Sequence, residues 1–97
     1  MERKAAQERI DELRQEIDRI DAELIALFER RMDTARAIGR IKRENGMDIK
    51  NLRREEQVKA NCRENCRNSL YAPYAEPVML SMIDASCALQ KLDAEDK

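Results

Sequence analysis

The chain has 97 residues, of which 40% are charged and only 3% are aromatic. Such a chain forms one small domain, and its composition favours amphipathic helices around an aliphatic core. Nineteen Lys and Arg residues face twenty Asp and Glu residues, and the net charge of -1 excludes the bulk positive charge on which non-specific nucleic-acid binding depends. The sequence contains no His, which excludes histidine general bases, histidine metal ligands and nucleophiles paired with a histidine.

The first predicted element is one long helix over residues 5–45. Its apolar residues recur at alternating steps of three and four, as in an amphipathic helix, and Asn45-Gly46 ends it. A helix of about forty residues is about 60 Å long, which exceeds a compact domain of this size, so we expect it to pack against a partner. The apolar stripe consists of Ile10, Leu13, Ile17, Ile20, Leu24, Leu27, Ile38 and Ile41.

A short second helix is predicted after a turn. Asn51 is a suitable N-cap because its side chain accepts a hydrogen bond from a backbone N–H of the first turn. The inner positions of this helix, read from its periodicity, are Leu52, Glu55, Val58, Cys62 and Cys66.

The third predicted helix begins with Pro73 in its first turn and runs to about Lys91, and Pro77 permits a start one turn later. Two neighbouring lines of side chains follow its axis. One line holds Val78, Met82, Ala85 and Leu89, and the other holds Met79, Ile83, Ser86 and Gln90.

We expect a single all-α domain over residues 1–97, with its core within 8–92 and a frayed tail at 93–97. The N-terminal residues lack the apolar run of a signal peptide or a membrane span, so we expect the protein in the cytoplasm and away from membranes.

The cysteines match no common disulfide framework or zinc pattern, so we expect reduced thiols and no metal. Arg63 and Arg67, next to the first two cysteines, disfavour a cation there. The cysteines are Cys62, Cys66 and Cys87.

Arg31 interrupts the apolar stripe of the long helix, four residues after Leu27. A buried guanidinium is costly unless an anion meets it, so a carboxylate of the protein or of a ligand is expected there. Extension into solvent or pairing with a local Glu explains Arg31 equally well. Lys42 lies about 20° around the helix and about 16 Å along it from Arg31, so both cations can reach one pocket.

Arg14 lies on the same helix about 25 Å from Arg31 and about 42 Å from Lys42, too far for one small ligand to contact all three. If the helix packs antiparallel on a second copy, Arg14 of one subunit approaches the other two cations of its partner. This arrangement predicts two equivalent pockets, each lined by both chains. The alternative is a plain antiparallel coiled coil with cations on its surface.

Inward polar groups on the two shorter helices strengthen the pocket interpretation. Glu55, Ser86 and Gln90 all occupy core-facing positions. Each also has a simpler explanation, because Glu55 can neutralise a nearby Arg and an inward Gln can satisfy a helix end or a buried water. Together with Arg31 and Lys42 they predict a pocket with excess positive charge, which suits a small dianion.

The run LRQEIDRIDAELIALFERRMDTARAIGRIK, from Leu13 to Lys42, is followed by NLRREEQV and by SCALQ. This succession resembles the all-helical class, or type II, of chorismate mutases. The resemblance extends from Leu13 to Gln90 and is carried by the spacing of its charged and amide residues. It implies an intertwined homodimer of three-helix chains and an isomerase of the shikimate pathway, which serves aromatic amino acid biosynthesis.

Carried over position by position, the resemblance implies how the substrate carboxylates are bound. Arg31 and Arg14 of the other subunit bind them, and Arg54 supports the site. Ser86 assists a carboxylate.

The resemblance also implies the residues at the reacting centre. Lys42 and Gln90 flank the ether oxygen of chorismate, and Glu55 holds the ring hydroxyl. The family often has Asp where this chain has Asn51, close to that hydroxyl; Asn still accepts a hydrogen bond, and the change is expected to loosen substrate preference.

The implied reaction fits the residues present, because the rearrangement of chorismate to prephenate is unimolecular and needs no nucleophile, proton relay, metal or cofactor. Two alternatives stay open at this point. An isochorismate-pyruvate lyase has the same fold and a similar cationic pocket, although Glu55 and the Arg-Glu pair within the segment RREEQV favour the mutase. The second alternative is a non-catalytic helical dimerisation or regulatory module.

Overall fold

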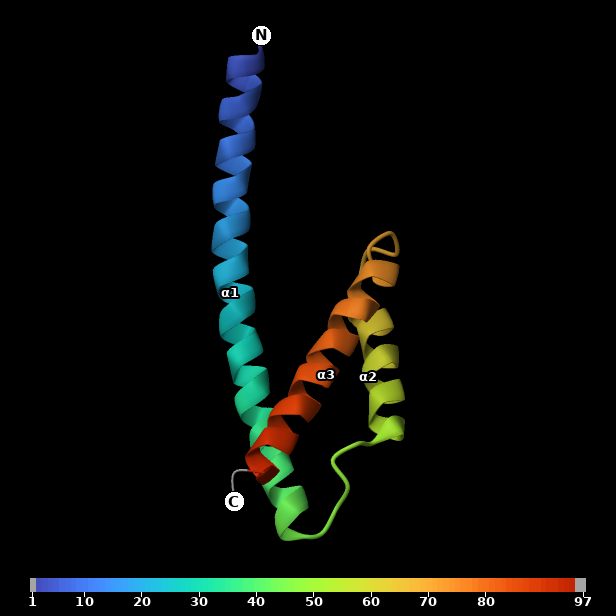
Figure 1. Cartoon of the computed structure of the whole chain (residues 1–97). Coiled ribbons are helices and arrows are strands. Elements are labelled where there is room, and N and C mark those ends of the chain that lie inside the picture. Colours follow the sequence, from blue (N-terminus) through green and yellow to red (C-terminus); the bar gives the residue numbers. More distant parts are fainter. Residues whose placement is uncertain (1, 96–97) are drawn as a thin grey trace. The chain divides into compact units, whose positions relative to one another are not determined.

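The computed structural model describes residues 2–95 and is all-α, with three helices and no strand in that range. They are α1 (Arg3–Glu44), α2 (Leu52–Asn65) and α3 (Ala72–Glu95), coloured in chain order in Figure 1. The three predicted helices are confirmed. No helix within the described range is long and apolar enough to cross a lipid bilayer.

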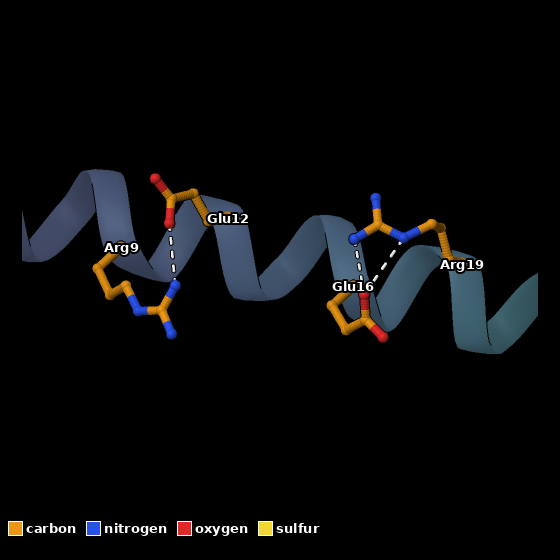
Figure 2. Close-up of polar contacts among 4 residues, drawn as sticks. All are labelled: Arg9, Glu12, Glu16 and Arg19. Carbon is orange, nitrogen blue, oxygen red and sulfur yellow. Dashed lines mark hydrogen bonds and ion pairs between the residues drawn. The ribbon is translucent and has the colours of Figure 1, made fainter.

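The chain divides into two compact units, Met1–Arg31 and Met32–Lys97. The first unit is formed by α1 alone. Its surface carries ion pairs at a spacing of three residues: Arg9 with Glu12 at 2.9 Å and Arg19 with Glu16 at 2.6 Å (Figure 2). Such exposed pairs contribute only about 0.2–0.5 kcal/mol each.

The apolar stripe of the first unit is exposed in the single chain. Because isolated helices gain most of their stability from packing of an apolar face, this stripe is expected to be covered in the working protein. Its six side chains are between 42% and 54% accessible, and they are Ile10, Leu13, Ile17, Ile20, Leu24 and Leu27.

The end of α1 is built as the sequence predicts. Gly46 adopts a left-handed backbone conformation with φ of 63°, which residues other than glycine rarely adopt. The N–H of Met47 donates to the carbonyl oxygen of Lys42 at 2.8 Å, and that of Gly46 to the carbonyl of Arg43 at 3.4 Å. These two bonds form a Schellman motif, which satisfies the last carbonyls of the helix.

In the second unit, α2 and α3 lie side by side (Figure 1). Val58 of α2 and Ile83 of α3 are buried, as are Met32 and Ala35 from the C-terminal half of α1. The core is therefore small and aliphatic. Arg63 contacts Glu76 at 3.4 Å, which links the end of α2 to the first part of α3.

The two lines of side chains on α3 differ in burial. Ile83, Ser86 and Gln90 are buried, so this line faces the interior of the second unit. Val78, on the other line, is 53% exposed. The buried face of α3 therefore combines one apolar side chain with two polar ones.

Leu52 was predicted to point inward and does not. Its side chain is 67% exposed. Leu52 is the first residue of α2, and it lies about 120° around the helix from the buried Val58. Leu52 is therefore outside the face of α2 that packs into the core. Glu55, Cys62 and Cys66 are half-buried.

The end of α3 also differs from the prediction, because the helix continues beyond Lys91 to Glu95 where a frayed tail was expected. Asp93 is held by Arg36 of α1, with Nε donating to Oδ2 at 2.9 Å and Nη2 to Oδ1 at 3.0 Å. No local sequence pattern predicts this bidentate contact, because 57 residues separate its partners. Residues 96 and 97 of the expected tail lie outside the described range.

Candidate active site

Six of the eight predicted site residues belong to the second unit and two to the first. The two in the first unit are Arg14 and Arg31. The six in the second unit are Lys42, Asn51, Arg54, Glu55, Ser86 and Gln90.

Arg14 and Arg31 differ in exposure. The side chain of Arg14 is exposed, and its nearest acid is Asp11, with Nη1 at 3.9 Å from Oδ1. Arg31 is half-buried and participates in further interactions of its own. The exposure of Arg14 leaves it available to a ligand or a second chain.

Gln90 is the most completely buried of the predicted residues, with 6% of its surface exposed. Its Nε2 donates to the carbonyl oxygen of Ala35 at 2.6 Å. A carbonyl only accepts hydrogen bonds, so the nitrogen of the Gln90 amide, and not its oxygen, must face Ala35. One N–H is thereby fixed to α1, and the amide retains a second N–H for another partner.

Lys42 lies on the α1 surface that Gln90 contacts. Gln90 packs directly against Gly39. Lys42 follows Gly39 by three residues, and residues three apart are neighbours on a helix surface. The half-buried Nζ of Lys42 donates to the carbonyl oxygen of Ile49 at 2.9 Å. An ammonium has three N–H groups, so two remain for a ligand. The structure therefore brings two hydrogen-bond donors to adjacent turns of α1.

Ser86 is buried one turn before Gln90 on α3. Its Oγ donates to the carbonyl of Met82 at 2.9 Å and lies 3.8 Å from Sδ of Met32. These contacts satisfy the hydroxyl within the protein. For Ser86 to donate to a ligand, the hydroxyl has to rotate away from Met82.

Asn51, Arg54 and Glu55 gather at the first turn of α2. The Asn51 side chain caps the helix by accepting from the Arg54 N–H at 3.1 Å, as the sequence predicts. The guanidinium of Arg54 donates to Gln57 at 2.8 Å and not to Glu55. Within residues 2–95 the half-buried carboxylate of Glu55 has no hydrogen-bond or ion-pair partner, and it sits at a helix N-terminus, which favours negative charge.

Asp93 has a perturbed pKa because of its contact with α1. The hydrogen bond from Arg36 lowers the pKa of Asp93 below its ordinary value, and the charges of Arg36 and Arg43 lower it further. The same hydrogen bond raises the pKa of Arg36. This pair fastens the end of α3 to α1, three residues after Gln90 makes its own contact with α1.

No group of three or more potential metal ligands is found among the residues that the structure describes. Cys62, Cys66 and Cys87 are unpaired, half-buried thiols.

A family model for type II chorismate mutases matches residues 13–91, which is most of the chain. The chain belongs to the type II chorismate mutase family. All eight residues of the candidate site fall within the matched segment, and so do all three helices in their greater part.

Two curated relatives are proteins named intracellular chorismate mutase, from Mycobacterium bovis and Mycobacterium tuberculosis. Each is 51% identical to this chain over 37 residues, which is 38% of the chain and 35% of the relative. The matched segment thus spans about a third of the length of these relatives. No solved structure is significantly similar to the chain.

Two features of this chorismate mutase fold were not evident from the sequence. The first is that the Ala35 and Ile49 carbonyls orient Gln90 and Lys42. Every residue has a backbone carbonyl, so the residue type does not indicate which carbonyl accepts such a bond. The second is that Gly39 is in contact with Gln90. A signal for Gly39 did exist, because a Gly inside a long helix costs about 1 kcal/mol relative to Ala and therefore indicates a packing requirement.

Proposed function

We propose that this protein converts chorismate to prephenate. In this pericyclic reaction the ether C–O bond of chorismate breaks while a new C–C bond forms between the side-chain methylene carbon and the ring. Six electrons move in one cycle, and no proton, nucleophile or cofactor takes part. The protein has to hold the substrate in its folded conformation and stabilise the negative charge that grows on the ether oxygen.

One observation carries this proposal: in a chain of this family, two hydrogen-bond donors with fixed orientation, one from α3 and one from α1, meet at the same surface of α1. Gln90 is tied to the Ala35 carbonyl and Lys42 to the Ile49 carbonyl, and each keeps at least one N–H in reserve. Because their orientation is fixed before the substrate arrives, little reorganisation is needed when charge develops on the ether oxygen. Gln90 is neutral, so its donor is present over a wide pH range.

Glu55 and Asn51 are assigned to the ring hydroxyl. Supporting this assignment, the Glu55 carboxylate is half-buried and has no protein partner within residues 2–95, so it is available to accept the hydroxyl proton in a hydrogen bond. Asn51 already uses Oδ1 as a helix cap. A carbonyl oxygen accepts two hydrogen bonds, so the cap does not exclude a second bond from the substrate.

The two substrate carboxylates are assigned to Arg31 and to Arg14 of a second subunit, with Arg54 and Ser86 in support. The separation of about 25 Å between Arg14 and Arg31 along one helix requires that a second chain supplies Arg14. The exposed guanidinium of Arg14 and the exposed apolar stripe of residues 10–27 favour this arrangement. The proposed working form is therefore an antiparallel homodimer with two shared pockets.

The experiment that tests this function offers purified protein chorismate and isochorismate in parallel. The proposal predicts loss of chorismate absorbance with formation of prephenate, and no release of pyruvate from isochorismate. Pyruvate release without prephenate would instead identify an isochorismate-pyruvate lyase. If neither substrate is consumed and chorismate gives no protection against heat, the chain is a non-catalytic helical module.

The cellular setting follows from the same proposal. Chorismate is a small dianion that does not cross membranes unaided, and the described helices include none that could span a bilayer. We assign the reaction to the cytoplasm and to aromatic amino acid biosynthesis. Localisation of the tagged protein to the soluble cytoplasmic fraction of its host would test this assignment.

A further inference from the structure

Gly39 and Gln90 approach each other more closely than a side chain at position 39 would allow. A Cβ atom placed on Gly39 would lie 2.7 Å from Cγ of Gln90 and 3.2 Å from its Cβ and Cδ. Non-bonded carbon atoms in unstrained contact are about 3.5–4.0 Å apart. Both residues are buried, so there is no solvent into which Gln90 can withdraw. Any larger residue at position 39 must therefore displace the Gln90 side chain.

The same close approach lets Gln90 reach the backbone of α1. In an α-helix the carbonyl of Ala35 is the acceptor for the N–H four residues later, which is that of Gly39. The Gln90 amide donates to this same carbonyl at 2.6 Å. A carbonyl oxygen has two lone pairs, so it can accept both bonds. The missing side chain at position 39 opens the path to the second lone pair.

We propose that Gly39 is a positioning residue for Gln90. By leaving space on α1, it keeps the Gln90 amide bonded to Ala35, so that the second N–H is held ready for the ether oxygen of the substrate. This inference rests on the proposed function only where it assigns Gln90 to the ether oxygen. The packing relationship between the two residues stands independently of any activity.

Four proteins test the proposal: the wild type, Gly39→Ala, Gln90→Ala and the double variant. For each, kcat and KM for chorismate and the thermal unfolding midpoint are measured. Gly39→Ala is expected to lower kcat by about tenfold to a hundredfold, because a displaced donor loses its alignment. KM should change by less than about threefold, because Gln90 does not bind the carboxylates. A matched control is Ala37→Ser on the exposed side of α1, which should leave kcat unchanged.

In the Gln90→Ala background the effect of Gly39→Ala should disappear. Gln90→Ala removes Cγ and Cδ and with them the 2.7 Å clash, leaving only the tighter-than-usual 3.2 Å contact with Cβ of residue 90, so kcat should not fall further. The loss in unfolding midpoint should then be smaller than with Gln90 present, because the 2.7 Å clash is gone and Ala favours a helix interior more than Gly does. With Gln90 present, the same substitution should lower the midpoint. A Gly39→Ala protein that fails to fold, together with a double variant that folds, supports the same conclusion.

The proposal is overturned if Gly39→Ala keeps kcat within about twofold of the wild type, or if it lowers kcat by the same factor in both backgrounds. A Gly39→Ala substitution that lowers the midpoint equally with and without Gln90 also overturns it. Failure of the proposed function looks different. A wild-type protein that does not convert chorismate contradicts the mutase assignment, while the four unfolding midpoints still decide whether Gly39 positions Gln90.

Discussion

The ammonium of Lys42 donates to the carbonyl oxygen of Ile49, at 2.9 Å, across the turn that joins α1 to α2. This bond ties the catalytic candidate on α1 to the segment that leads into the cap of α2. Lys42 therefore has a structural contact and a proposed chemical one, and its remaining N–H groups allow it to make both.

Lys42→Ala is expected to lower turnover of chorismate at least about a hundredfold, because a preorganised donor at a developing charge is typically worth roughly 3 kcal/mol. Steady-state kinetics checks this. Lys50→Ala, which removes an exposed cation from the same connecting segment, serves as the control and should change turnover little. Turnover of Lys42→Ala close to that of the wild type would remove Lys42 from the reacting centre.

Gln90→Ala is expected to lower turnover to a similar extent, and Gln90→Glu to make turnover depend on pH. An ionised carboxylate cannot donate to the substrate, and its charge would repel the Ala35 carbonyl. Burial and that carbonyl both raise the pKa of the introduced carboxyl group. Turnover of Gln90→Glu should therefore rise as the pH falls, whereas the wild type stays nearly flat over the same range. A flat profile for both proteins would contradict the assignment of Gln90.

The sequence predicted the helices well because their signals are local. Asn51 caps α2 and Gly46 ends α1 as their residue types indicate. Asp93 was assigned to a frayed tail because its partner Arg36 is 57 residues away, and no local pattern reveals such a pair. Leu52 was assigned to the inner face because it continued the periodicity, although its position had already turned about 120° from Val58.

The candidate site divides in the same way. Residue types and spacing sufficed to nominate Lys42, Glu55 and Gln90, because polar side chains at core positions stand out against an apolar pattern. Spacing along a sequence does not report where a backbone carbonyl lies, so the roles of Ala35 and Ile49 required the structure. The same holds for Gly39, whose contact lies on a different helix.

Asp93→Asn is expected to destabilise the second unit at neutral pH, because it removes the negative charge that Arg36 and Arg43 stabilise. The pKa of Asp93 is lowered in the folded protein, so its contribution to stability is present above its ordinary pKa of 3.8 and is lost as the pH falls through the lower folded value. Thermal unfolding at neutral and at strongly acidic pH measures this.

The difference in unfolding midpoint between the wild type and Asp93→Asn should therefore shrink in acid. Glu12→Gln, which breaks an exposed pair with Arg9 in the first unit, is the comparison and should have a smaller effect at neutral pH. If Asp93→Asn were as stable as the wild type at neutral pH, the contact with Arg36 would not hold the end of α3.

Dimer formation is expected to depend on the apolar stripe of the first unit. Leu24→Glu places a charge in the middle of that stripe, whereas Glu23→Gln changes a neighbouring charged position and serves as the control. Sedimentation should show a shift of Leu24→Glu toward monomer and a loss of chorismate turnover at the same time, because Arg14 would no longer reach the second chain. A monomeric and fully active Leu24→Glu protein would refute the shared pocket.

The most direct test of the central claim mixes two inactive variants. Arg14→Ala and Lys42→Ala are each expected to be nearly inactive, since each damages both pockets of its own homodimer. After the two are unfolded and refolded together, half of the dimers should be mixed, and each mixed dimer has one intact pocket. Turnover should then recover to about a quarter of the wild-type value if each pocket takes Arg14 from one chain and Lys42 from the other. Turnover that stays at the level of the separate variants would contradict a pocket built from two chains.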